Sequence, residues 1–141
     1  MTIYCIMFTV SREFTFCYGH RLLDYGGKCV HPHGHNARVL VKLWSDNLNG
    51  QGMVLDFAEQ KRTIGKWIDE QLDHVMILQT GDPLVEIFQN INEPIFILPE
   101  PPTAENIARL LFEKIEEFGF PVKSVTFWET DKCFAEYQKT R

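Results

Sequence analysis

The sequence predicts an α+β fold with a single β-sheet and helices packed on one of its faces. Segments whose side chains alternate with a period of two lie near both ends of the chain, and two segments with apolar residues at helical spacing lie between them. The resulting order is strand, strand, helix, helix, strand, strand. This grouping of strands and helices is typical of an α+β domain.

The length and composition describe one globular domain over residues 1–141. Hydrophobic residues make up 45% of the 141 residues, and no repeat or linker divides the chain. The formal net charge of −5 argues against nucleic acid as a partner, because proteins that bind phosphate backbones present a basic surface. No apolar run reaches the roughly 20 residues needed to cross a bilayer, so we expect no membrane partner.

The cysteines and the N-terminal residues favour a cytoplasmic protein. The four cysteines, which lack CxxC pairing, are Cys5, Cys17, Cys29 and Cys133. Residues 1–8 lack the basic stretch and the small-residue cleavage site of a signal peptide. We therefore expect reduced thiols rather than disulfides.

The first two predicted strands lie at the N-terminal end. Over residues 4–20 the even positions are mostly aromatic or aliphatic, so one face of the strand points to a core, and His20 lies on that face. Glycines and a proline place a loop over residues 23–32. Alternation resumes over residues 33–44, and two successive strands joined by a loop most simply pair antiparallel.

Two helices are predicted in the middle of the chain. The first begins after Asp56 as N-cap, with Glu59 three residues later. The second has Thr103 as N-cap and ends at Gly119. Their apolar stripes, each expected to be buried, are Phe57, Ile64, Trp67, Ile68 and Leu72 in the first helix and Ala104, Ile107, Ala108, Leu111, Ile115 and Phe118 in the second.

The remaining segments are a connection and a final pair of strands. Residues 81–102 contain five prolines and one short apolar run, so we interpret them as an insert-like connection with weak local structure. Residues 122–130 and 133–138 alternate around a turn at Asp131 and Lys132, which predicts two strands.

The histidines are the main functional signal. Four of the five lie within sixteen residues: His20, His31, His33 and His35. His33 and His35 are two apart on a predicted strand and therefore share a face, and an antiparallel partner strand can bring His20 alongside. Three imidazoles with an open position suit a catalytic Zn²⁺ ion. The alternative is a set of surface histidines in a turn; His31 is interpreted as a loop residue that could reach a substrate.

Cys29 lies four residues before His33, and two roles compete for it. As a fourth ligand it would close the coordination sphere and make the zinc site structural. As a free thiol near the metal it would have a lowered pKa and could remove protons. The sequence leaves both roles open.

Six short motifs in order resemble the 6-pyruvoyltetrahydropterin synthase superfamily. They are Phe16-x-x-x-His20-Arg21-Leu22, Cys29-x-x-x-His33-Gly34-His35, Gly52-Met53-Val54-Leu55-Asp56-Phe57, Leu72-Asp73-His74, Pro102-Thr103-Ala104-Glu105-Asn106 and Trp128-Glu129-Thr130. The three-residue gap after Cys29 is more similar to the bacterial branch, the 6-carboxytetrahydropterin synthases of queuosine biosynthesis. Two departures are Tyr18-Gly19, where the family commonly has two small residues, and the long segment 81–102.

The resemblance implies a fold and an assembly. It implies the tunnelling fold, a four-stranded antiparallel sheet with two helices on one face. Sheets from several copies close into a barrel, giving a homo-oligomer that is a hexamer built as a dimer of trimers.

The resemblance also implies roles for individual residues. Zinc would be held by His20, His33 and His35, and protons would be transferred by Cys29, Asp73 and His74. Glu129 would anchor the pterin ring through two acceptor oxygens. Arg21 and Lys28 are candidates for binding the triphosphate. Thr103 is also a candidate for binding the substrate, although its role as a helix N-cap explains the presence of a threonine at this position equally well.

The implied activity is that of a zinc-dependent lyase. It would convert 7,8-dihydroneopterin triphosphate to 6-carboxy-5,6,7,8-tetrahydropterin with loss of triphosphate and acetaldehyde. One alternative keeps the machinery but stops at 6-pyruvoyltetrahydropterin. An alternative of another class is a non-catalytic binding module whose fold is stabilised by a structural zinc ion, with Cys29 as the fourth ligand.

Overall fold

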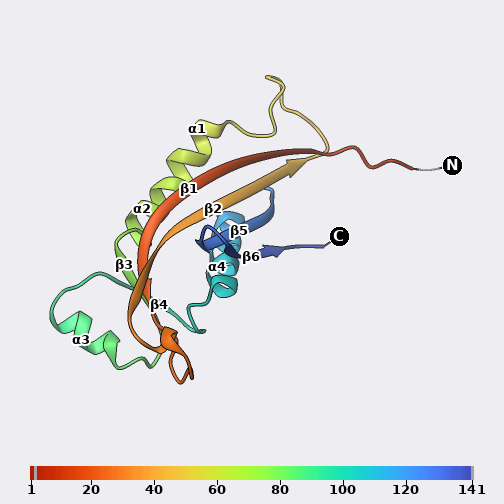
Figure 1. Ribbon diagram of the computed structural model, residues 1–141. Coiled ribbons are helices and arrows are strands. Elements are labelled where there is room, and N and C mark those ends of the chain that lie inside the picture. The colour runs from red at the N-terminus through yellow and green to blue at the C-terminus, as the bar shows by residue number, and fades with distance from the viewer. Residues whose placement is uncertain (2, 141) are drawn as a thin grey trace.

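The computed structural model of the protein describes residue 1 and residues 3–140 (Figure 1). Its centre is a curled sheet of six strands in the order β4-β3-β1-β2-β5-β6. The strands are β1 (Phe8–His20), β2 (His33–Ser45), β3 (Val75–Gln79), β4 (Ile95–Leu98), β5 (Val122–Thr130) and β6 (Cys133–Gln138). The expectation of a four-stranded antiparallel sheet is therefore wrong, because β3 and β4 extend the sheet and pair parallel.

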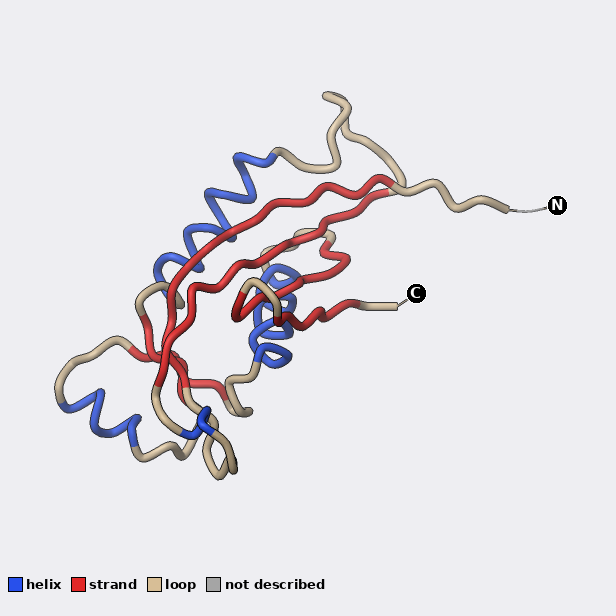
Figure 2. Tube along the Cα trace, in the orientation of Figure 1, coloured by secondary structure: helices blue, strands red, loops and turns tan. Residues whose placement is uncertain are grey.

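The two longest strands form the hairpin that carries the histidines. β1 and β2 run antiparallel in one unbroken register from Phe8 opposite Ser45 to His20 opposite His33. Figure 2 shows them side by side along almost their whole length. The alternation of the sequence extends back to Tyr4, but β1 begins only at Phe8, because the partner strand ends at Ser45.

The helices are α1 (Phe57–Gln60), α2 (Lys66–Gln71), α3 (Leu84–Asn90) and α4 (Ala104–Glu117), and a π-helical turn, Lys61–Gly65, joins α1 to α2. The predicted caps are confirmed: Asp56 accepts a hydrogen bond from the amide of Ala58, and Thr103 accepts one from the amide of Asn106. Gly119 has a φ of 86°, the left-handed conformation that ends α4.

One hydrophobic core joins the sheet to these helices. Its members include Phe16, Val39 and Phe127 from the sheet, Ile68 from α2 and Leu111 from α4. Two residues of the predicted stripes are exposed: the exposed fraction is 49% for Phe57 and 36% for Phe118. Both lie at helix ends, where the helical period continues but the sheet no longer covers the side chain.

The segment 81–102 is more ordered than the sequence predicts. It contains α3 and β4, and β4 pairs parallel with β3, which itself pairs parallel with the last three residues of β1. The prolines lie at the borders of these elements and not within them. No helix in the described part of the chain is long and apolar enough to span a membrane.

Candidate metal and substrate site

Three of the predicted ligands converge where β1 ends and β2 begins. His20 pairs with His33 across the hairpin, and His35 lies one pleat further along β2. The ring centroids are 4.6 Å apart for His20 and His33, 5.0 Å for His33 and His35, and 5.1 Å for His20 and His35. One nitrogen from each ring lies within 4.8 Å of the other two, so the cluster can hold one metal ion.

Backbone carbonyls fix the orientation of two of these rings. Nδ1 of His20 donates to the carbonyl of Pro102 and Nδ1 of His33 donates to the carbonyl of His31, each at 2.7 Å. A carbonyl oxygen only accepts, so Nδ1 carries the proton and Nε2 carries the lone pair. The predicted loop residue His31 therefore contributes to the site through its backbone.

The remaining nitrogens fit a metal ion. Nε2 of His20 and Nε2 of His35 are buried without a hydrogen-bond partner in the described part of the chain, although buried polar atoms are normally satisfied. Burial is the main cause that lowers the pKa of His20 to about 4, and the neighbouring His33 and His35 lower it further. Burial also lowers the pKa of His35. Both rings are therefore neutral at neutral pH, which is the form that binds metal.

Tyr18 supports the cluster and was not predicted as a site residue. Its ring centroid lies 5.1 Å from that of His20 and 5.7 Å from that of His35. Burial and then the charge of Glu129 raise the pKa of Tyr18, so its hydroxyl stays protonated. The sequence feature that could have indicated this role is the even-numbered position of Tyr18 on β1, which places it on the same face as Phe16 and His20.

A cavity of about 320 Å³ lies beside His20 and contains several predicted residues. Cys29, Thr103 and Glu129 all line it. Oε1 of Glu129 lies 3.9 Å from Nε2 of His20. Cys29 belongs to a 3₁₀ turn, Lys28–Val30, and its carbonyl accepts from the amide of Leu22, which holds the turn against the end of β1. The fold thus brings a thiol and a carboxylate beside His20 of the three-histidine cluster.

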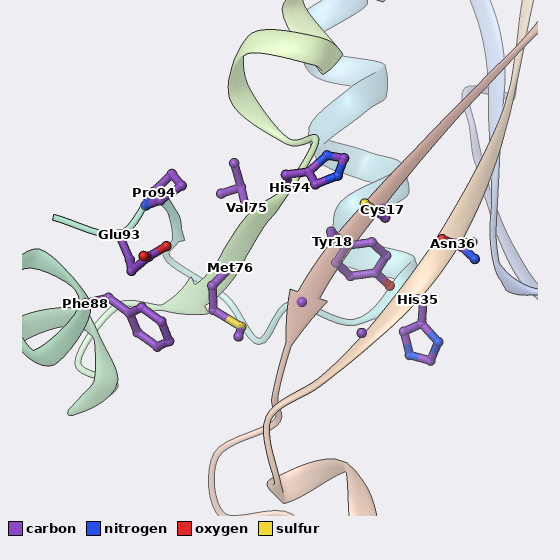
Figure 3. Close-up of a pocket in the computed structure, with 12 residues that line it drawn as sticks. Cys17, Tyr18, His35, Asn36, His74, Val75, Met76, Phe88, Glu93 and Pro94 are labelled. Atoms are coloured by element: carbon purple, nitrogen blue, oxygen red, sulfur yellow. The ribbon is translucent and has the colours of Figure 1, made fainter. Parts of the chain in front are cut away.

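Asp73 and His74 lie elsewhere in the chain. His74 lines a second cavity, of about 450 Å³, which it shares with Cys17 and residues near α3 (Figure 3). Oδ2 of Asp73 lies 2.9 Å from Nδ1 of His74, and Oδ1 accepts from the amide of Cys17 at 3.0 Å. Cys29 does not line this second cavity, so a single chain does not join the two halves of the predicted proton-transfer set.

Cys17 holds this pair in place and was also not predicted. Its carbonyl accepts from the amide of His74 at 2.7 Å, which fixes His74 at a φ of 57°. Partial burial alone would raise the pKa of Asp73, but the hydrogen bonds from Cys17 and His74 outweigh it and the pKa lies below its ordinary value. Asp73 is therefore a carboxylate that orients the imidazole.

Arg21 and Lys28, the two candidates for binding the triphosphate, have different surroundings in the structure. Arg21 makes a two-pronged ion pair with Asp82, with Nε 2.8 Å from Oδ2, and Asp82 is only 3% exposed. Asp82 also accepts from the amide of Leu84 at the start of α3. Lys28 is exposed. We therefore assign Arg21 to anchoring α3 beside the end of β1.

The substitution Arg21→Gln tests this anchoring role. It removes a charged pair from a buried carboxylate, so we expect the free energy of unfolding to fall by about 2 kcal/mol. Lys28→Gln, at an exposed position, is the matched control and should change the free energy of unfolding by less than about 0.5 kcal/mol. Urea denaturation of both variants measures the difference, and equal values would contradict the assignment.

The sheet, its helices and the three-histidine cluster define an α+β protein with a site of the kind that holds a divalent metal. The model of the 6-pyruvoyl tetrahydropterin synthase family matches residues 9–140, so the chain belongs to this family of enzymes.

Individual relatives cover nearly the whole chain. A protein of Haemophilus influenzae named 6-carboxy-5,6,7,8-tetrahydropterin synthase is 33% identical over 94% of this chain and 100% of its own length. The structure of an uncharacterized protein from Wolinella succinogenes is 30% identical, with a TM-score of 0.79 over 96% of this chain and 99% of that one. The 6-pyruvoyl tetrahydropterin synthase of Caenorhabditis elegans is 27% identical, with a TM-score of 0.72 over 99% and 100%.

Proposed function

We propose that the protein is a zinc-dependent lyase that converts 7,8-dihydroneopterin triphosphate and one molecule of water to 6-carboxy-5,6,7,8-tetrahydropterin, triphosphate and acetaldehyde. The observation that carries the proposal is the placement of Cys29 and Glu129 on the cavity beside the three histidines. The name of the Haemophilus influenzae relative supports this product. We place the enzyme in the biosynthesis of queuosine and related 7-deazapurines.

The proposed zinc ligands are His20, His33 and His35. Their donor set suits Zn²⁺, and two of their Nε2 atoms are buried without a partner. When bound there, zinc would act as a Lewis acid that acidifies the hydroxyls of the substrate side chain and polarises a carbonyl.

The other residues of the cavity would orient the substrate and move its protons. Glu129 would accept two hydrogen bonds from the N–H groups of the pterin ring, a planar match to a carboxylate. The Cys29 thiolate would remove a carbon-bound proton from the side chain. Thr103 lines the same cavity. Its hydroxyl oxygen already accepts a hydrogen bond from the amide of Asn106, so we propose that its O–H group donates to the substrate.

We propose that Asp73 and His74 complete the active site of a neighbouring copy. Within one chain they line a different cavity from Cys29. Asp73 would orient His74 and stabilise its charged form while His74 exchanges a proton with the substrate. None of the described residues that line either cavity is a lysine or arginine, so we assign the cations that hold the triphosphate to neighbouring copies as well.

The open sides of the sheet support the assembly that this requires. β3 pairs with β1 only over Tyr18–His20, which leaves the same edge of β1 without a partner strand over residues 8–16, and β6 forms the other border of the sheet. Unpaired edges are templates for pairing with another chain. We infer that copies join through these edges into a barrel, as a hexamer formed by two trimers.

We further propose a cytoplasmic location for the enzyme. Cys17, Cys29 and Cys133 are free thiols, and the proposed mechanism needs Cys29 in the reduced state. The partner of the enzyme there would be its small-molecule substrate, the pterin triphosphate.

The product distinguishes the two activities that this machinery can perform. We expect the zinc-loaded protein to convert 7,8-dihydroneopterin triphosphate to 6-carboxy-5,6,7,8-tetrahydropterin, with one molecule of acetaldehyde for each triphosphate, as measured by mass spectrometry and aldehyde trapping. A product that keeps all three side-chain carbons would instead favour 6-pyruvoyltetrahydropterin synthase, the activity named for the Caenorhabditis elegans neighbour. Absence of both products would contradict the proposal.

A further inference from the structure

A second group of metal-ligating side chains shares no residue with the three histidines, although His35 lines the same cavity as Cys17 and His74. One donor atom each from Cys17, Asp73 and His74 lies within 4.8 Å of the other two. The donors are a sulfur, a carboxylate oxygen and an imidazole nitrogen, and they come from β1 and from the turn before β3. Figure 3 shows the side chains of Cys17 and His74 close together at one end of the second cavity.

We propose that Cys17, Asp73 and His74 form a second site for a thiophilic divalent cation, and that zinc bound there inhibits the enzyme. The inhibitory part rests on the proposed function, because it needs Asp73 and His74 to transfer protons. The site itself does not depend on the reaction.

The backbone holds the three donors in place before any ion arrives. The amide of Cys17 donates to Oδ1 of Asp73 at 3.0 Å, and the carbonyl of Cys17 accepts from the amide of His74 at 2.7 Å. These bonds use backbone atoms and Oδ1, which leaves the thiol, Oδ2 and the ring of His74 for the cation. Since ligands held in position lose little freedom on binding, such a site needs little rearrangement.

The chemistry of the donors selects the cation. Thiolate and imidazole favour Zn²⁺ and its substitute Co²⁺ over Mg²⁺ and Ca²⁺, which prefer oxygen ligands. The carboxylate of Asp73 is ionised, because hydrogen bonds hold its pKa below the ordinary value. Binding displaces the thiol proton of Cys17 to solvent, so a dipositive ion meets two anionic ligands and one neutral ligand.

Access and competition explain the inhibition. The side chain of His74 is 78% exposed and lines a cavity of about 450 Å³, so an ion can reach it. Nδ1 of His74 and Oδ2 of Asp73 lie 2.9 Å apart and share a hydrogen bond in the metal-free pair. A cation on these two atoms takes the lone pairs that the proton needs, so the pair can no longer act as acid or base.

Cobalt titration tests the site without using turnover. We expect the chelator-treated, full-length protein to bind two Co²⁺ ions per chain, and the second to produce a thiolate-to-cobalt charge-transfer band. Cys17→Ser should abolish that band and weaken the second binding step at least about tenfold. Cys29→Ser removes the other thiol close to a metal cluster, and Cys133→Ser is the exposed control; both should keep the band.

Three results would overturn the site. They are binding of only one Co²⁺ per chain, a second ion without a thiolate band, and a band lost in Cys29→Ser but kept in Cys17→Ser. Circular dichroism spectra of the variants check that each is folded, and Cys17→Ala replaces Cys17→Ser if the latter is not.

Zinc inhibition tests the consequence. We expect turnover at one Zn²⁺ per chain to fall at least about tenfold when zinc is raised to saturate the second site, and the same ratio in Cys17→Ser to stay near one. Excess Mg²⁺ should not inhibit. If the protein shows no turnover under any condition, the proposed function fails while the cobalt result still decides the site. Inhibition that persists unchanged in Cys17→Ser would contradict the inhibitory role.

Discussion

Replacing Cys29 with alanine is expected to lower turnover of 7,8-dihydroneopterin triphosphate by about 10²–10⁴-fold, the range that a positioned general base contributes. The thiol lines the cavity beside His20, and the proposed zinc ligands are three imidazoles that do not include it. The variant should therefore keep the zinc held by the three histidines and an unchanged melting temperature. Steady-state kinetics, metal analysis and calorimetry on one preparation measure all three quantities.

The matched control is Cys133→Ala, because Cys133 lines the same cavity and is exposed. It should retain turnover within a few-fold of the unchanged protein. The rival hypothesis, a non-catalytic module stapled by zinc, makes the opposite prediction for Cys29. If Cys29→Ala loses its zinc and unfolds, Cys29 is the fourth ligand and the lyase assignment is wrong.

The features predicted correctly from the sequence are those set by local periodicity and capping. Alternation over the first hairpin places His20 on the core side of β1, and register then puts it opposite His33. Asp56 and Thr103 mark helix starts because their side chains bond amides two and three residues away. Such contacts are readable from neighbouring residues alone.

The features that the sequence did not predict depend on contacts between distant segments. β3 and β4 are short and pair parallel, so their partners lie far away in the chain and no turn marks them. Arg21 meets Asp82 across 61 positions, and Cys17 meets Asp73 across 56. Nothing near Arg21 in the sequence indicates that its charge is paired, and Cys17 lies on the polar face of its strand where a solvent-facing side chain is the simpler expectation.

Two inactive variants are expected to restore activity to each other when they assemble together. Cys29→Ala removes one half of the proposed composite site, and His74→Asn removes the other; asparagine is chosen because His74 has a φ of 57°, which asparagine tolerates. In a ring of identical contacts, each site takes Cys29 from one subunit and His74 from its neighbour. When the two variants assemble at random in equal amounts, Cys29 is intact in half of the sites, and His74 is independently intact in half of them. About a quarter of the sites should then be complete, so co-expressed protein should recover about a quarter of the unmodified activity.

The control pairs His74→Asn with Asp73→Asn, two changes in the same half of the site. Each subunit in this mixture lacks a working Asp73–His74 pair, so no arrangement of neighbours completes a site and activity should stay at background. Separate affinity tags on the two variants confirm that mixed oligomers form. If confirmed mixed oligomers of Cys29→Ala and His74→Asn recover no activity, the two halves of the site act within one chain. A conformational change would then have to bring His74, on the 450 Å³ cavity, to the substrate in the 320 Å³ cavity beside Cys29. Recovery that only the first mixture shows would place Asp73 and His74 in the active site of a neighbouring copy.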